Sequence, residues 1–134
     1  MDFLLSTGSL YTYGIARCFE LAARAGFDGI ELLVDERWDT RQAGYVRSLV
    51  NRHGLPVRVV HAPFRSVSGW PPAQEARIRM SSELAEALGA AVVTHHLPMR
   101  FGYGVLKFGV RQWFVLLPMW RMERAYRQWI EGGY

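Results

Sequence analysis

The sequence is poor in cysteine, in lysine and in long apolar runs, and each scarcity excludes a class of protein. Its one cysteine, Cys18, cannot form a disulfide within the chain. Fifteen of its sixteen basic residues are arginines scattered along the chain, and the formal charge is only +4, so no dense nucleic-acid-binding patch is expected.

The most apolar stretch, residues 101–120, is interrupted by Lys107, Arg111 and Pro118, which argues against a membrane span. The N-terminus has no basic region and no long apolar core of a signal peptide. We therefore expect a soluble, cytoplasmic protein.

A repeated glycine organises what is present. Gly26, Gly54 and Gly89 each follow a segment of helical periodicity and each precede a short run rich in β-branched residues. Glycine at such a place closes a helix in the left-handed conformation. With a first strand at the N-terminus the order is βαβαβαβ, which is typical of right-handed crossover units and a parallel sheet. We predict an α/β fold with helices on one face and parallel strands in the order 1-2-3-4, near residues 3–7, 29–34, 57–62 and 91–96.

Apolar residues at helical spacing predict the buried faces of the three helices. Asp39 is a plausible N-cap for the second helix, and Pro71-Pro72 fits the start of the third. The three predicted stripes are Ile15, Phe19, Ala22 and Ala23; Ala43, Val46, Leu49 and Val50; and Ala76, Met80, Leu84, Ala87 and Leu88.

Two histidines share one position in the repeat, and a glutamate, five residues after Gly26, shares their strand phase. His61 lies seven residues after Gly54, and His96 lies seven residues after Gly89. Glu31 has the same strand phase, whereas His95 has the opposite phase. Catalytic groups of parallel α/β folds cluster where the strands end, so these three side chains are expected to converge on one mouth. Two imidazoles and a carboxylate suit a divalent metal or sugar hydroxyls.

Structural interpretations of the same residues stay open. A histidine near a strand end is usually a hydrogen-bonded structural residue, and Glu31 is equally consistent with an ion pair to a nearby arginine. Two histidines at equivalent registers favour a functional interpretation. Cys18 lies among apolar helix residues and is expected to be a buried structural thiol.

The order of these motifs resembles a known superfamily. The run AARAGFDGIELLVDE resembles the first helix and second strand of the xylose-isomerase-like TIM barrels, which include sugar phosphate isomerases, epimerases and endonuclease IV. VRVVHAPF resembles their third strand, and LAEALGAAVVTHHLP resembles their fourth. The resemblance covers about residues 1–98 and implies a partial TIM (β/α)8 barrel, with about four βα units and residues 1–134 as its N-terminal half. Residues 99–120 match nothing in it and are an atypical loop or insertion.

The resemblance also implies a function and roles for the three residues. In the endonuclease IV branch, histidines that match His61 and His96 bind zinc. In the isomerase and epimerase branch, histidines at these places more often contact substrate, and a divalent metal (Zn, Mn, Mg or Co) is held mostly by residues of later strands. We therefore expect His61 and His96 as metal ligands, and Glu31, His61 and His96 as substrate-binding residues.

Three functional hypotheses follow. The first is a fragment of a metal-dependent sugar or sugar phosphate isomerase or epimerase that acts on a small sugar or polyol and is inactive alone, with weak metal binding. The second is an abasic-site endonuclease, although the loops are aromatic rather than lysine-rich. The third is a non-catalytic half-barrel that assembles with another chain, for example as a homo-oligomer, because a complete barrel takes roughly 250 residues. Its open face is expected to carry Val57, Val59, Val92 and Thr94.

Overall fold

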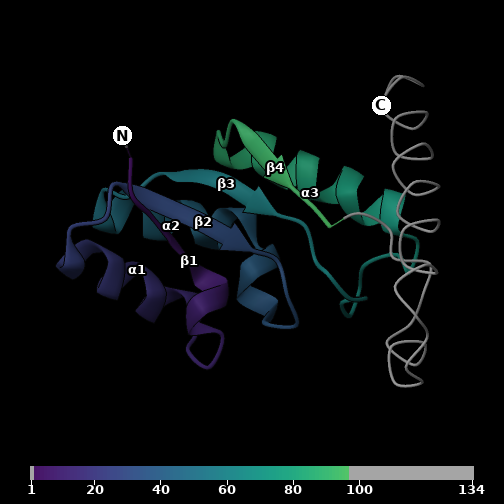
Figure 1. The fold of residues 1–134 in the computed structure, drawn as a ribbon, viewed down its shortest axis with the longest axis horizontal. Helices are drawn as coiled ribbons and strands as arrows, with labels where there is room; N and C mark the ends of the chain where they lie inside the picture. Colours follow the sequence, from purple (N-terminus) through teal and green to yellow (C-terminus); the bar gives the residue numbers. More distant parts are fainter. Residues whose placement is uncertain (1, 97–134) are drawn as a thin grey trace, which may run out of the picture. The chain divides into compact units, whose positions relative to one another are not determined.

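A computed structural model describes residues 2–96 as an α/β unit built around one sheet (Figure 1). The four strands are parallel and lie in the order β1-β2-β3-β4, which confirms the predicted fold class and strand order. The elements along the chain are β1 (Leu4–Ser6), the short 3-10 helix η1 (Thr7–Leu10), α1 (Ile15–Ala25), β2 (Gly29–Leu33), the 3-10 helix η2 (Trp38–Arg41), α2 (Ala43–His53), β3 (Val57–His61), α3 (Gln74–Leu88) and β4 (Val92–Thr94).

Each long helix ends at the glycine that the repeat predicts. Gly26, Gly54 and Gly89 have φ angles of 77°, 67° and 70°. Their backbone N–H groups return to carbonyls of the last helical turn, so each glycine satisfies acceptors that would otherwise lack partners. The turn that follows leads directly into the next strand, and this local rule sets the alternation of helix and strand.

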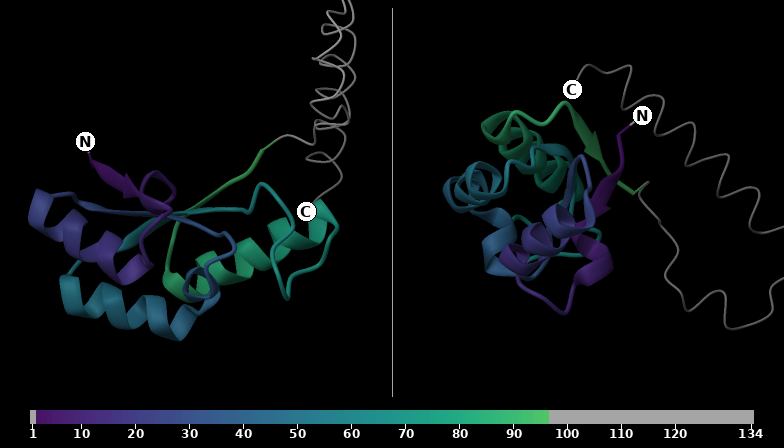
Figure 2. Two further views of the ribbon diagram at one scale, coloured as in Figure 1. Left: turned by 90° about the horizontal axis from the view of Figure 1, so that it is seen from below. Right: turned by 90° about the vertical axis from the view of Figure 1, so that its left-hand side faces the viewer.

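All three long helices cover the same face of the sheet (Figure 2). The core lies between them and the strands, and it includes Ile15 and Phe19 of α1, Leu49 of α2, and Ile30 and Leu32 of β2. The predicted faces of α1 and α2 are largely confirmed, but Ala23 is exposed and Cys18 takes its place in the core.

The predicted face of α3 is rotated relative to the observed one. Ala87 is exposed, and the buried residues of this helix are Arg77, Ser81, Leu84 and Ala85. The prediction failed because it placed apolar residues inside and polar ones outside, whereas α3 buries an arginine and a serine. Hydrogen bonds make this burial possible, since Arg77 Nη1 donates to the carbonyl of Pro72 and Ser81 Oγ donates to the carbonyl of Arg77.

A register shift between β2 and β3 changes which face Val57 occupies. Ile30 pairs with Val57, but the next residue, Glu31, pairs with Val59. The extra residue lets Val57 join the helix-side core at 2% exposure, while Arg58 is exposed. The expectation that Val57 lies on the open face is therefore wrong.

The face away from the helices carries a mixture of apolar and polar side chains. Val59 and Thr94 lie on it by strand alternation and are partly buried, and Val92 on β4 is 47% exposed. His61 and Glu31 share this phase. The helix-free face of the sheet therefore bears the residues that the sequence selected as a site.

The remaining predictions fall outside residues 2–96. They concern the atypical segment 99–120. The described residues belong to one compact unit. Within this part of the chain, no helix has the length and apolar character to cross a membrane.

Candidate functional site

Glu31, His61 and His96 meet at the edge of the sheet where the strands end. Nδ1 of His61 lies 3.2 Å from Oε1 of Glu31, on the neighbouring strand. Nε2 of His61 lies 3.3 Å from Nε2 of His96, which follows β4 by two residues. The two imidazole centroids are 5.2 Å apart. The predicted convergence is thus observed, and His96 is the histidine whose ring meets His61.

The contact with Glu31 orients the His61 ring. A carboxylate accepts hydrogen bonds, so the contact favours a proton on Nδ1 of His61, which donates to Glu31. Nε2 of His61 is the ring nitrogen that faces His96. A carboxylate behind a histidine is the usual arrangement around metal-binding imidazoles, because it fixes the tautomer and raises the basicity of the other nitrogen.

The spacing of the two Nε2 atoms fits joint coordination of one metal ion. Zinc–nitrogen bonds of about 2.0–2.1 Å at tetrahedral angles place two ligand nitrogens about 3.3–3.4 Å apart. The observed 3.3 Å agrees with that separation. However, among residues 2–96 no group of three or more His, Cys, Asp or Glu side chains is arranged to hold a metal. The described part of the chain therefore offers two nitrogen ligands rather than a full coordination sphere.

Groups from α3 and from the β3–α3 segment surround His96. Gln74 Nε2 donates a 2.7 Å hydrogen bond to the carbonyl of His96. The ring of Phe64 meets the ring of His96 edge-on, with centroids 4.8 Å apart. The neighbouring His95 has Nδ1 3.2 Å from the same carbonyl. Neither Gln74 nor Phe64 was selected from the sequence, because nothing in the local pattern around either residue points to His96.

A shallow pocket of about 540 Å³ lies near the histidine pair, although neither histidine lines it. Leu33, which is paired with His61 in the sheet, and Phe64, which touches His96, both line it. Tyr11, Glu36 and Arg65 add an aromatic ring, a carboxylate and a guanidinium to its wall. The pocket thus lies at the carboxyl edge of the first three strands, where ligands of parallel α/β proteins bind.

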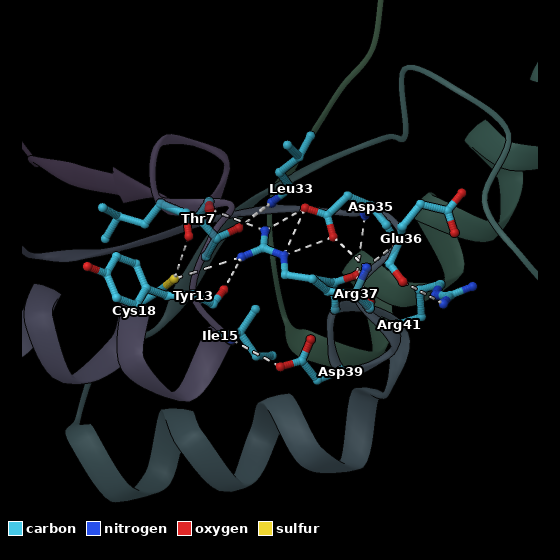
Figure 3. Close-up of polar contacts among 12 residues, drawn as sticks. Thr7, Tyr13, Ile15, Cys18, Leu33, Asp35, Glu36, Arg37, Asp39 and Arg41 are labelled. Carbon is cyan, nitrogen blue, oxygen red and sulfur yellow. Dashed lines mark hydrogen bonds and ion pairs between the residues drawn. The ribbon is translucent and has the colours of Figure 1, made fainter.

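Arg37 is the centre of a second polar cluster at this edge (Figure 3). Its guanidinium contacts both carboxylate oxygens of Asp35, at distances of 2.6–2.9 Å. It also donates to the carbonyls of Tyr13 at 2.8 Å and Thr7 at 3.2 Å. Thr7 in turn accepts a hydrogen bond from the backbone N–H of Leu33 at 2.9 Å. One arginine therefore joins the segments that follow β1 and β2.

The main charges in this cluster, those of Arg37 and Asp35, are paired with each other. Burial disfavours the charged form of Arg37, but the hydrogen bonds and attraction of Asp35 outweigh burial and raise the pKa of the guanidinium. Burial raises the pKa of the Cys18 thiol, and the nearby Arg37 only partly offsets this effect. Cys18 is fully buried, as the sequence predicts, and the raised pKa disfavours the reactive thiolate.

Asp39 caps a helix, but not the predicted one. The N-cap of α2 is Gln42, and Asp39 lies in η2. Oδ2 of Asp39 accepts the backbone N–H of Ile15, the first residue of α1, at 3.0 Å. The prediction considered only the helix that follows Asp39 in sequence, whereas folding places the start of α1 beside it. Similarly, α3 begins at Gln74 with Ala73 as its N-cap, so Pro71-Pro72 precedes the helix.

Comparison with known proteins supplies relatives but no activity. The chain is 36% identical over 99 residues to an uncharacterized protein of Mycobacterium leprae, and 37% identical over 99 residues to uncharacterized proteins of Mycobacterium bovis and Mycobacterium tuberculosis. Each alignment covers 72% of this chain and 35% of the relative, so the chain spans about a third of the length of the relatives it matches. No described protein family matches the chain. No solved structure matches it either.

Proposed function

We propose that the chain forms the N-terminal half of a xylose-isomerase-like (β/α)8 barrel, whose complete form is a metal-dependent isomerase or epimerase of a small sugar, sugar phosphate or polyol. The observation that most directly supports this proposal is the arrangement of Glu31, His61 and His96 at the carboxyl edge of a parallel sheet. The relatives support the barrel: 99 aligned residues make up 35% of each, which implies about 280 residues in total. A complete (β/α)8 barrel takes roughly 250 residues.

The two histidines would hold a divalent ion through their Nε2 atoms. When bound, such an ion stabilises the negative oxygen that forms as a proton is removed next to a carbonyl. Among the ions named, two nitrogen ligands favour zinc or cobalt over magnesium and manganese, which prefer oxygen ligands. Glu31 would orient the His61 ring through its hydrogen bond to Nδ1. Any contact between Glu31 and a substrate would be made in addition to this hydrogen bond. The pocket next to Phe64 would receive the rest of the substrate.

An abasic-site endonuclease is the second candidate, and one observation favours it. The resemblance assigns zinc-binding histidines to the positions of His61 and His96 in that branch, and the 3.3 Å separation of their Nε2 atoms suits a shared ion. The exposed side chains at the pocket weigh against it. Tyr11 and Phe64 are aromatic, Glu36 is acidic, and Arg65 supplies the exposed positive charge there. A DNA-binding surface needs a larger excess of positive charge.

A half-barrel that assembles with another copy is the third candidate. The helix-free face carries the exposed Val92, and the edge strands β1 and β4 offer backbone groups for pairing. For either enzyme a complete site needs groups beyond Glu31, His61 and His96. We therefore expect weak metal binding and no isomerase turnover from this chain alone.

Metal titration tests the proposal directly. We expect Co²⁺ or Zn²⁺ to bind the chain, and we expect His61→Ala and His96→Ala each to weaken binding by more than roughly tenfold. Even outer-shell partners of a metal site contribute that much, and a ligand contributes at least as much. Calorimetry and the visible spectrum of Co²⁺ measure the effect.

His53→Ala is the matched control, since His53 ends α2 and its ring faces Phe19 with centroids 6.2 Å apart. Equal affinities for the unmodified protein, the two site variants and this control would contradict the proposed metal site. Robust chelator-sensitive turnover of a sugar by this chain would contradict its assignment as an inactive half.

A further inference from the structure

We infer that Gln74 is a positioning residue that holds the imidazole of His96 against His61. The need for such a residue follows from where β4 ends. The strand stops at Thr94, whose carbonyl accepts the backbone N–H of Ala62 at 2.8 Å. His96 lies two residues further along and is exposed. The sheet by itself therefore leaves the backbone of His96 free to move, although its ring makes a specific 3.3 Å contact with His61.

Gln74 anchors this backbone from α3, and its contact with the His96 carbonyl is shorter than the 3.2 Å contact of the adjacent His95 Nδ1 with the same carbonyl. It is the first residue of α3, a helix of 15 residues that packs against β3 and β4. Its side-chain amide donates to the carbonyl of His96 at 2.7 Å, across 22 residues of sequence. Ordering the glutamine side chain costs conformational entropy. Because the side chain is attached to a helix, its short hydrogen bond nevertheless restrains the carbonyl more than a mobile water molecule would.

Holding the carbonyl determines where the ring lies. The imidazole of His96 occupies the space between the edge of Phe64, at 4.8 Å between centroids, and Nε2 of His61. Phe64 and Gln74 lie near the two ends of the segment that joins β3 to α3. The middle of that segment is tied to the segment after β2, because Arg41 donates to the carbonyl of Ser68. The joining segment thus holds His96 by its ring and by its carbonyl.

The part of this inference that concerns metal affinity rests on the proposed function, whereas the part that concerns the ring contact does not. Gln74→Glu is the sharpest variant, because glutamate has nearly the same shape but no N–H to donate and repels a carbonyl oxygen. Gln74→Ala removes the whole amide. Glu75→Gln is the matched control: it makes the reverse exchange at the next residue of α3, which is exposed.

Two readouts on the full chain test the inference. The first uses nuclear Overhauser contacts between the imidazole protons of His61 and His96 without metal, in a protein with only four histidines to assign. We expect these contacts in the unmodified chain and in Glu75→Gln, and their loss in Gln74→Glu and Gln74→Ala. The second readout is Co²⁺ titration, in which we expect both Gln74 variants to bind about tenfold more weakly with an altered visible spectrum.

The outcomes separate the inference from the proposed function. Unchanged ring contacts in both Gln74 variants would overturn the inference, whether or not metal binds. Loss of those contacts in a chain that binds no Co²⁺ would support Gln74 as the anchor of His96 and reject the metal site. Equal loss in Glu75→Gln would show that the first turn of α3, and not the amide of Gln74, determines the position of His96, which would also overturn the inference.

Discussion

At the scale of single residues, the site depends on side chains whose partners lie far away in sequence. Glu31 and His61 are 30 residues apart, and His61 and His96 are 35 apart. Arg37 combines a local partner, Asp35, with the carbonyl of Thr7, 30 residues earlier. Such contacts bring the ends of successive strands to fixed separations. A metal site needs such fixed separations, because a displacement of a ligand atom by a few tenths of an ångström is significant relative to a metal–ligand bond of about 2 Å.

Arg37 is expected to be the strongest single polar determinant of stability at this edge. Arg37→Ala removes a hydrogen-bonded ion pair whose side chains are only 16% and 25% exposed. Asp35 then keeps the backbone N–H of residue 37 as a donor but loses its guanidinium partner. We expect the free energy of unfolding to fall by about 2–3 kcal/mol, somewhat less than for a fully buried pair. Arg37→Lys keeps the charge but loses the planar fork, so about half of that loss is expected.

Urea denaturation followed by circular dichroism measures these changes. Arg17→Ala is the matched control, since Arg17 forms an ion pair with Glu20 in which both side chains are more than 40% exposed. Little measurable change is expected for an exposed pair of this kind. If Arg37→Ala and Arg17→Ala had the same effect, the cluster around Arg37 would not join the β1 and β2 ends as described.

At the scale of secondary-structure elements, the helix-closing glycines carry the repeat. Gly54 has a φ angle of 67°, and a Cβ added there meets no heavy atom within 4 Å. A Cβ added at Gly44, inside α2, also meets nothing within 4 Å, but there the backbone is helical. The two positions therefore differ in backbone conformation and not in available space.

Alanine at these two glycines is expected to have opposite effects. Gly54→Ala forces an L side chain into the left-handed region and should lower the free energy of unfolding by about 1 kcal/mol. Gly44→Ala should raise it by about 0.5 kcal/mol, because alanine loses less backbone entropy in a helix. Chemical denaturation of both variants checks the signs. A stabilising Gly54→Ala would mean that the left-handed ending of α2 is not required.

At the scale of the whole unit that residues 2–96 form, one face of the sheet is covered by the three long helices, and none of these helices covers the other face. Val92 is 47% exposed on β4, and the partly buried Val59 lies on the same face. Burial of apolar surface is worth roughly 25 cal/mol per Å², so covering this face favours association, against which the entropy of association must be subtracted. Association through this face is therefore the expected behaviour of the chain.

Sedimentation at micromolar concentration tests the association. We expect a dimer or larger assembly, and Val92→Lys should shift it toward monomer because the charge would have to be buried at the contact. Tyr45→Lys changes another exposed apolar residue, on α2, and should leave the assembly unchanged. A stable monomer that binds no hydrophobic dye would rule association out.

The sequence by itself determined the features that depend on local chemistry. The spacing of seven residues between a helix-closing glycine and a strand-end histidine occurs twice. It was sufficient to place His61 and His96 on the same strand phase, because strand alternation and left-handed helix endings are properties of short segments. Alternation of such segments also fixed the parallel order of the four strands, since a crossover helix leaves few other arrangements. Ala23 and Ala87 are exposed although the helical periodicity predicted them as buried, because periodicity locates a buried face only approximately.

Only the tertiary structure decided which distant groups meet. Asp39 caps α1 rather than α2, Val57 enters the core through a one-residue register shift, and Gln74 holds the carbonyl of His96. None of these leaves a signal in the neighbouring sequence, because each depends on the packing of elements that are far apart along the chain. Hydrogen bonds of this kind form wherever folding brings a donor and an acceptor within about 3 Å, and that coincidence is a property of the assembled fold.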